Sequence, residues 1–221
     1  MLVTITNTGR MAQTVTPTAA IPLYGRSADN IRDHRHVTSL LHRIETTDTG
    51  VLVTPTLSFD ERGHQVNHMT YYCVGWSGNG EKPVDFYPTA EDFVGEGGNF
   101  ERPYAIVKNA EGVKAGTKIE GLEAVGGLHF SEITLEPEEE CSYLIFTGIT
   151  EDIQEIRNLS KTYTTREKVL EELEKTKAYW QEKVNVAYHT GDSDFNQFMH
   201  WVSFQPILRR IYGCSFLPHH D

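Results

Sequence analysis

The sequence predicts a mainly β protein with C-terminal helices, in which a β-sandwich over residues 1–150 is followed by helical segments up to residue 221. Two observations lead to this fold class. Up to Ile149, apolar and polar residues alternate in short runs separated by turn residues, the period-two pattern of half-buried antiparallel strands. After Gly148, apolar residues recur at the spacing of a helix face, so the architecture changes there.

The β region contains four clear strand patterns, at residues 3–6, 51–54, 71–74 and 143–146. Turn residues separate the runs, and we expect their glycines to supply the positive φ angles of tight turns. These glycines are Gly9, Gly50, Gly63, Gly78, Gly80, Gly126 and Gly127. The spacing is typical of a large β-sandwich. Because the chain opens directly in a strand, we expect that strand to pair with preceding sequence, so that the sandwich is a partial one.

The first expected helix connects the sandwich to the C-terminal segment of the chain. Thr164 and Glu167 have the spacing of a capping box, in which each side chain bonds to the backbone N–H of the other residue. Apolar residues then recur at helical spacing, at Leu170, Leu173, Trp180, Val184 and Ala187. The opposite face is charged, which is typical of a solvated surface. We therefore expect residues 151–190 to form a helical linker.

A second helix is expected to begin with Asp192 or Ser193 as its N-cap. Pro206 lacks an amide hydrogen and should bend or end this helix. The residues expected on its buried side are Phe195, Phe198, Met199, Val202 and Phe204.

Composition excludes several functional classes. The 221 residues carry a formal net charge of −11, which repels nucleic acid and anionic membrane surfaces. No segment approaches the ~20 apolar residues of a membrane-spanning helix, and the N-terminus lacks a signal-peptide pattern. The three cysteines are far apart, which favours reduced thiols and a cytoplasmic location.

Histidines are the natural candidates for a metal site. His34 and His36 form one pair, and His219 and His220 precede the terminal Asp221. Neither cluster has the spacing of a known zinc motif such as HExxH. A polar loop or a substrate-binding cluster therefore explains them better, and we expect no bound metal and no cofactor.

The loop at residues 95–98, Gly-Glu-Gly-Gly, lacks the residues that complete a Walker or dinucleotide-binding motif. It is therefore expected to be a loop with unusual backbone angles. Carboxylates and aromatic rings surround it, a mixture that suits sugars because carboxylates accept from hydroxyl groups and rings stack on sugar faces. These residues are Phe86, Tyr87, Glu91, Asp92, Phe93, Glu96 and Phe100.

Three long strings of residues resemble one enzyme family. They are PTLSFDERGHQVN at 55–67, FYPTAEDFVGEGGNFERP at 86–103 and QPILRRIYGCSFLPHHD at 205–221. Together they resemble the glycoside phosphorylases of glycoside hydrolase family 94, which include cellobiose, cellodextrin, chitobiose and 1,2-β-oligoglucan phosphorylases and a domain of cyclic β-1,2-glucan synthases. The last string is the most specific, because so long a run of aromatic, arginine and histidine residues seldom recurs by chance.

The resemblance implies a galactose-mutarotase-like β-sandwich, a helical linker, an (α/α)6 barrel that carries the active site, and a small C-terminal β domain. Residues 1–150 would then be the later part of the sandwich and residues 151–190 the linker. Residues 191–221 would be the start of the barrel. We accordingly expect the chain to be a piece of a larger enzyme whose general acid lies beyond residue 221, so that the piece alone is inactive.

The activity implied by the resemblance is inverting phosphorolysis of β-linked gluco-oligosaccharides, a glycosyltransferase reaction that releases α-glucose 1-phosphate. Inorganic phosphate is the co-substrate, and the full-length protein could form a homodimer. The residues implied to bind sugar and phosphate are Thr89, Glu91 and Asp92 in the sandwich and Arg209, Arg210, His219, His220 and Asp221 at the barrel. For Arg209 and Arg210 a structural role at a helix C-terminus is equally consistent with the sequence, and Glu91 could equally be a surface carboxylate.

Two other functions stay open. A non-catalytic carbohydrate-binding β-sandwich would explain the acidic and aromatic loop at 86–103 without a complete catalytic set. A metal-dependent β domain built on His34, His36 and a distant ligand is the weaker alternative, because these histidines lack the spacing of a known zinc motif.

Overall fold

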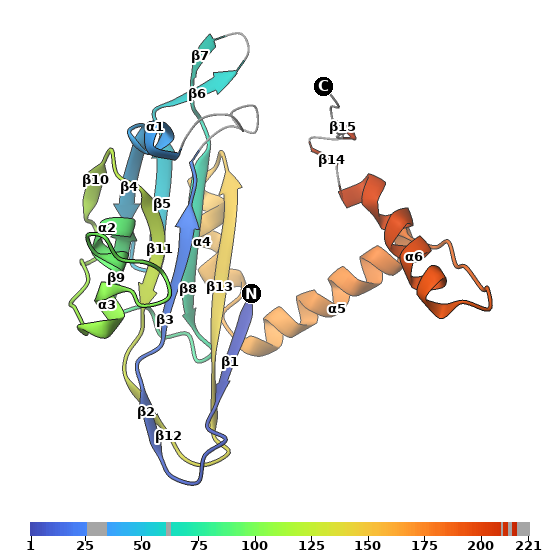
Figure 1. The fold of residues 1–221 in the computed structure, drawn as a ribbon, viewed down its shortest axis with the longest axis horizontal. Helices are drawn as coiled ribbons and strands as arrows, with labels where there is room; N and C mark the ends of the chain where they lie inside the picture. Colours follow the sequence, from blue (N-terminus) through green and yellow to red (C-terminus); the bar gives the residue numbers. More distant parts are fainter. Residues whose placement is uncertain (26–34, 61–62, 209, 212–213, 216–221) are drawn as a thin grey trace. The chain divides into compact units, whose positions relative to one another are not determined.

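A computed structural model describes residues 1–25, 35–60, 63–208, 210–211 and 214–215 (Figure 1). The chain forms two compact units, Met1–Val169 and Leu170–Asp221. Antiparallel sheets make up the first unit and helices dominate the second, as the sequence predicts. The division of the chain at residues 150 and 190 stays a prediction.

The first unit is built on a six-stranded antiparallel sheet with strand order β1-β13-β8-β5-β4-β10. The longest pairing joins β13 to β8, with Tyr143 opposite Ser77 and Thr150 opposite Thr70. All four strand patterns identified in the sequence lie in this sheet, in β1, β5, β8 and β13. The strands are β1 Leu2–Thr6, β4 His42–Thr46, β5 Gly50–Pro55, β8 Thr70–Ser77, β10 Lys118–Glu120 and β13 Glu140–Thr150.

A three-stranded antiparallel sheet, with order β3-β11-β9, faces the larger one. Two-stranded ladders join β2 to β12 and β6 to β7, and a short ladder, β14–β15, belongs to the second unit. The strands are β2 Gln13–Val15, β3 Thr18–Leu23, β6 Leu57–Asp60, β7 Gly63–Val66, β9 Asp85–Thr89, β11 Ala124–His129, β12 Ile133–Leu135, β14 Arg210–Ile211 and β15 Cys214–Ser215.

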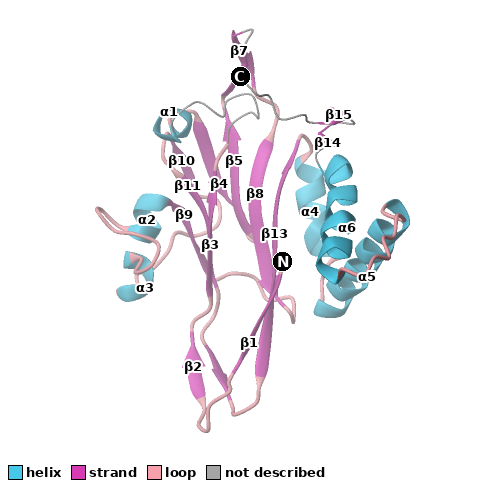
Figure 2. Ribbon diagram, turned by 45° about the vertical axis from the view of Figure 1, so that its right-hand side comes forward, coloured by secondary structure: helices cyan, strands magenta, loops and turns pink. Residues whose placement is uncertain are grey.

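The hydrophobic core has three layers, because each sheet is covered on both faces (Figure 2). Between the sheets, Val51, Val53 and Leu128 are wholly buried. On the outer face of the larger sheet, Trp76 and Leu144 pack against Ile156 of α4. The outer face of the smaller sheet is covered by α2 and α3. The helices of this unit are α1 Arg35–Ser39, α2 Ala90–Val94, α3 Tyr104–Val107 and α4 Ile153–Thr162.

The prediction of positive φ angles holds for two of the seven turn glycines. Gly63 and Gly80 have φ angles of 113° and 85°, whereas Gly9, Gly50, Gly78, Gly126 and Gly127 do not have positive φ angles. Gly126 and Gly127, in contrast, do not form a turn as predicted but lie inside β11. A Cβ atom on Gly126 would lie 2.2 Å from Cβ of Cys73, so the absence of a side chain there lets β11 pack on β8.

The second unit contains most of α5, Arg166–Lys183, and all of α6, Ser193–Leu208. The cap of α5 is one residue later than predicted, because the Val169 amide donates to the Thr165 carbonyl oxygen. Asp192 caps α6 as predicted, accepting from the amides of Asp194 and Phe195 at 3.0 Å each. Pro206 does not end this helix, since α6 runs to Leu208, and the alternative that it bends the helix stays a prediction.

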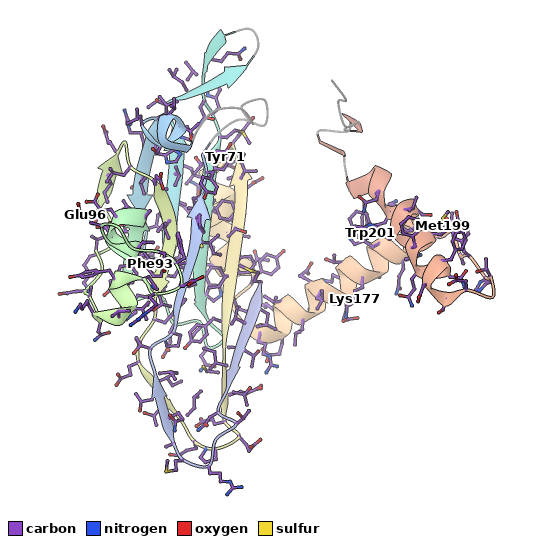
Figure 3. The ribbon with its side chains drawn as sticks, viewed as in Figure 1. Tyr71, Phe93, Glu96, Lys177, Met199 and Trp201 are labelled. Atoms are coloured by element: carbon purple, nitrogen blue, oxygen red, sulfur yellow. The ribbon has the colours of Figure 1, made fainter. Side chains whose placement is uncertain are left out.

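The apolar faces of these helices are far less buried than predicted. Phe195, Phe198 and Val202 are 45%, 59% and 39% exposed. Trp180 packs edge-on against Phe204, with ring centroids 4.4 Å apart, whereas Met199 and Trp201 project from α6 in Figure 3. Helical spacing therefore identified the helices correctly but not the burial of their apolar residues.

Among the described residues, no helix is long and apolar enough to cross a bilayer. Cys73 and Cys141 are free thiols. Burial raises the pKa of the Cys73 thiol to about 12, so it stays protonated and unreactive at neutral pH.

Candidate carbohydrate-binding pocket

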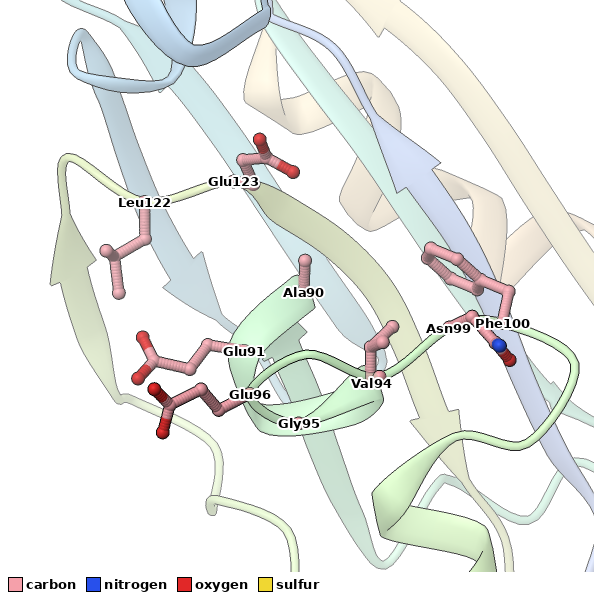
Figure 4. Close-up of a pocket in the computed structure, with 10 residues that line it drawn as sticks. Ala90, Glu91, Val94, Gly95, Glu96, Asn99, Phe100, Leu122 and Glu123 are labelled. Carbon is pink, nitrogen blue, oxygen red and sulfur yellow. The ribbon is translucent and has the colours of Figure 1, made fainter.

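An open pocket of about 510 Å³ lies beside α2 in the first unit (Figure 4). Three segments line it: α2 itself, the loop after this helix, and the residues that lead into β11. The lining residues are Ala90, Glu91, Val94, Gly95, Glu96, Gly98, Asn99, Phe100, Leu122 and Glu123. The acidic and aromatic stretch singled out in the sequence thus forms most of one pocket.

Thr89 and Asp92 fix the start of α2. The Thr89 hydroxyl oxygen accepts from the Asp92 amide at 3.0 Å, and the hydroxyl donates to Oδ2 of the Asp92 carboxylate at 2.7 Å. Thr89 is only 1% exposed. Both side chains therefore serve as a helix cap, and neither is among the residues that line the pocket.

Glu91 and Glu96 are the acidic residues that face the pocket from the α2 side. Figure 4 shows their carboxylates extending to the same side of the helix. Glu91 lies in the first turn of α2, and Glu96 lies in the loop just after Gly95 ends the helix. Two neighbouring carboxylates offer several acceptor oxygens for the hydroxyl groups of a sugar.

The glycine loop has the unusual backbone geometry that the sequence predicts. Gly95 and Gly97 have φ angles of 81° and 69°. A Cβ atom on Gly98 would lie 2.2 Å from the Val94 carbonyl oxygen, so only glycine lets the loop fold back on α2. This return places Glu96 beside Glu91 and directs the chain toward Asn99 and Phe100.

Phe100 supplies the aromatic surface of the pocket. It is 47% exposed, and its ring centroid lies 5.9 Å from that of the buried Phe93, which in turn packs on Tyr87. Asn99 fixes the turn after it, because its Oδ1 accepts from the amides of Glu101 and Arg102 at 3.0 Å each. Nearly half of the Phe100 surface is thus exposed at the pocket, and aromatic surface of this kind can stack on a sugar.

Sequence reasoning missed the far wall of the pocket, formed by Leu122 and Glu123. Behind this wall, His42 is 2% exposed and lines a smaller cavity that also contacts Phe100 and Glu123. Nε2 of His42 accepts from the Gly25 amide at 3.2 Å, so Nδ1 carries the proton and donates to the Leu122 carbonyl oxygen at 3.1 Å. Burial lowers the pKa of His42, which keeps the imidazole neutral.

Sequence reasoning also missed a largely buried pair at the other end of β9 from α2. Asp85 and His129 face each other across the β9–β11 ladder, with Oδ1 of Asp85 2.6 Å from Nδ1 of His129. Lys114 lies 3.9 Å from the other carboxylate oxygen. No local motif joins residues 44 positions apart, so only the strand register shows this pair.

The expected barrel residues fall largely outside the described part of the chain. Arg209, His219, His220 and Asp221 all lie outside the described residues. Arg210 lies in β14, but its side chain is also outside them. Their roles therefore stay predictions.

The metal candidates give a similar result. His34 lies outside the described residues, as does the side chain of His36 in α1. Over the described residues, no group of three or more His, Cys, Asp and Glu side chains is arranged to hold a metal ion.

Comparison with known proteins identifies the first unit. No curated protein matches the sequence significantly. The family model described as "Glycosyl hydrolase 94, supersandwich domain" matches residues 1–166, three quarters of the chain, and this range nearly coincides with the first compact unit. The chain therefore belongs to the glycosyl hydrolase 94 family, and its β-sandwich is the supersandwich domain of that family.

Proposed function

We propose that this chain is part of an inverting glycoside phosphorylase that cleaves β-linked gluco-oligosaccharides with inorganic phosphate and releases α-glucose 1-phosphate. At the family level, membership implies an enzyme of the glycoside hydrolase and phosphorylase type acting on oligosaccharides with phosphate. The match over residues 1–166 is the observation that carries the proposal.

The proposed reaction needs only one carboxylic acid. That acid protonates the leaving glycosidic oxygen, while phosphate attacks the anomeric carbon from the opposite face and inverts it. Phosphate arrives already charged, so the site must supply cationic or amide donors rather than a general base. In this proposal Arg209, Arg210, His219 and His220 hold phosphate or sugar, with Asp221 beside them.

The sandwich would contribute to substrate binding through the pocket at α2. Glu91 and Glu96 would accept hydrogen bonds from sugar hydroxyls, and Phe100 would stack on a sugar face. Thr89 and Asp92 would act indirectly, by capping the helix that carries Glu91. A neutral, hydroxyl-rich ligand suits a pocket whose ionisable lining residues are all acidic.

Turnover is the test of this function. The full-length protein should release sugar 1-phosphate from a β-linked gluco-oligosaccharide only when phosphate is present, and NMR of the first product should show the α anomer. Release of free glucose in the absence of phosphate would contradict the proposal. A set of cello- and β-1,2-gluco-oligosaccharides covers the two linkage classes that the resemblance suggests.

A non-catalytic carbohydrate-binding module is the second candidate, favoured because the pocket lies wholly within the first unit. This alternative predicts sugar binding without turnover by the full-length protein. Isothermal titration calorimetry with the same oligosaccharides measures binding alone, so the two experiments together separate the candidates. Glu91→Gln and Phe100→Ala should weaken binding in both cases, whereas Glu101→Gln, outside the pocket lining, is the matched control.

A further inference from the structure

The wall of the pocket opposite α2 is a short crossover between the two sheets. Residues 121–123 join β10 of the larger sheet to β11 of the smaller one and belong to neither strand. Leu122 and Glu123 both line the pocket from this crossover, and Figure 4 shows them across from Glu91. Residues outside a ladder lack its regular hydrogen bonds, so single contacts decide where they lie. The shape of the pocket therefore depends on what holds the crossover.

Hydrogen bonds hold the crossover at both of its ends. At the α2 end, the Ala90 amide donates to the Glu123 carbonyl oxygen at 2.8 Å. At the other end, His42 of β4 supplies two bonds. Its backbone carbonyl oxygen accepts from the Gly121 amide at 3.0 Å, and Nδ1 of its ring donates to the Leu122 carbonyl oxygen at 3.1 Å. The ring bond is the one that a change of side chain removes.

The ring of His42 is itself held on its other side. Nε2 accepts from the Gly25 amide at 3.2 Å, which leaves the proton on Nδ1 for Leu122. An added Cβ on Gly25 would lie 3.2 Å from Nε2 and 2.7 Å from Cγ of Pro55, so this segment packs closely on the ring. A buried ring with both nitrogens bonded has one orientation, as a residue that positions others requires.

His42 reaches a ligand only through the crossover. It is not among the residues that line the pocket. Its ring lines a separate cavity of about 20 Å³ behind the wall, which Phe100 and Glu123 also line. Such a cavity has room for about one water molecule and none for a sugar ring. Any effect of His42 on sugar binding therefore passes through the backbone of residues 121–123.

We propose that His42 is a positioning residue of the pocket at α2, because its Nδ1–H group fixes the Leu122 carbonyl and so sets where Leu122 and Glu123 lie opposite Glu91. This role rests on the proposed function, since it takes this pocket as the site of sugar binding. Without the ring bond, the crossover is free to shift at the β4 end. Affinity then falls although every lining residue is still present, because the two walls no longer fit one ligand.

A pair of substitutions at His42 isolates the ring bond to Leu122. His42→Leu removes both ring nitrogens, whereas His42→Asn keeps an amide donor bonded to Cγ, as Nδ1 is. Both variants lose the acceptor of the Gly25 amide, so they differ in the bond to Leu122. Calorimetry on the full-length protein with cello- and β-1,2-gluco-oligosaccharides should give His42→Leu a Kd about three- to tenfold above wild type, the contribution of one hydrogen bond. His42→Asn should stay within about twofold of wild type.

His129→Leu is the matched control for a general loss of stability. His129 is another largely buried histidine of the first unit, and its Nδ1 lies 2.6 Å from Oδ1 of Asp85. It does not line the pocket. This variant should unfold more readily than wild type, because the buried Asp85 carboxylate loses a partner, but it should bind the same oligosaccharides with an unchanged Kd.

Hydrogen–deuterium exchange follows the crossover without a ligand. Amides in peptides that cover residues 121–123 should exchange about three- to tenfold faster in His42→Leu, but not in His42→Asn or His129→Leu. Unchanged exchange or an unchanged Kd in His42→Leu would overturn the proposal, as would an equal loss of affinity in the two His42 variants. Absence of sugar binding by the wild type would instead contradict the proposed function of the pocket, and the exchange comparison then decides the positioning role by itself.

Discussion

The two units of the chain use their apolar residues in opposite ways. In Met1–Val169, Val51, Val74 and Leu128 are wholly buried, and apolar layers cover both faces of each sheet. In the second unit, Phe198 and Trp201 are more than half exposed. Both units contain clear apolar periodicity, so periodicity alone does not determine burial.

The difference shows what each kind of pattern specifies. Alternation along a strand fixes which face is buried. The hydrogen bonds to neighbouring strands set the register, so the apolar residues of all the strands lie on the same face and cover each other. A helix carries its backbone bonds internally and needs a separate surface to bury its apolar stripe. The sandwich therefore buries its own apolar residues, whereas α6 leaves much of its apolar side exposed.

Truncating one large apolar residue in each unit should give the largest difference in the free energy of unfolding between the two units. Leu128→Ala removes a fully buried side chain between the sheets and should lower the free energy of unfolding by about 2–5 kcal/mol. Phe198→Ala removes a 59% exposed ring and should change it by less than about 0.5 kcal/mol. Chemical denaturation followed by circular dichroism measures both, and equal losses would contradict the contrast.

Adding a methyl group at a glycine tests packing density in the same two units. Gly126→Ala would place Cβ 2.2 Å from Cβ of Cys73 and should cost about 1–3 kcal/mol in stability. Gly191 has nothing within 4 Å of an added Cβ, so Gly191→Ala is the control and should be close to neutral. Thermal denaturation of both variants gives the comparison, which would fail if Gly126→Ala were tolerated equally well.

His42 gives the sandwich a predicted pH dependence. Burial lowers its pKa in the folded state, so below the ordinary value of 6.5 the unfolded chain binds a proton that the folded chain does not. The contribution of His42 to the free energy of unfolding should therefore be fully present above pH 6.5 and decrease as the pH drops below this value. His42→Gln should cost about 1–3 kcal/mol at neutral pH through its unpaired partners and should flatten this slope. Denaturation curves at several pH values measure both effects, and an identical slope in the variant would exclude His42 as the cause.

The smallest predicted effect concerns the contact between the larger sheet and α4. Trp76 Nε1 donates to the Tyr163 carbonyl oxygen at 2.8 Å, and its ring stacks 5.1 Å from Phe146. Trp76→Phe keeps an aromatic ring but loses the donor, so about 0.5–1.5 kcal/mol should be lost. Trp201→Phe in α6, with its ring 56% exposed, is the matched control and should have little effect. Similar losses of stability in the two variants would contradict a stabilising role for the Trp76 hydrogen bond.

The fold was more predictable from sequence than the site. Four strands of the large sheet follow from alternation at residues 3–6, 51–54, 71–74 and 143–146, because that signal is local. The prediction of a turn at Gly126 and Gly127 is wrong, since their close packing against β8 and β9 depends on residues far away in the sequence. The pocket shows the same limit. Glu91, Glu96 and Phe100 are neighbours in the sequence, but Glu123 joins them only through the sheets, and so does His42 in the adjoining smaller cavity.

Phosphate-dependent turnover by the full-length protein, compared between wild type and Phe100→Ala, tests the central claim most directly. Phe100 is exposed in the pocket and is not part of the sandwich core, so the variant should fold normally. We predict α-glucose 1-phosphate from the wild type. Phe100→Ala should show a KM for the oligosaccharide raised by about three- to tenfold, since a stacked ring contributes roughly 0.5–1.5 kcal/mol. Phosphate-independent hydrolysis, or an unchanged KM in the variant, would contradict the account.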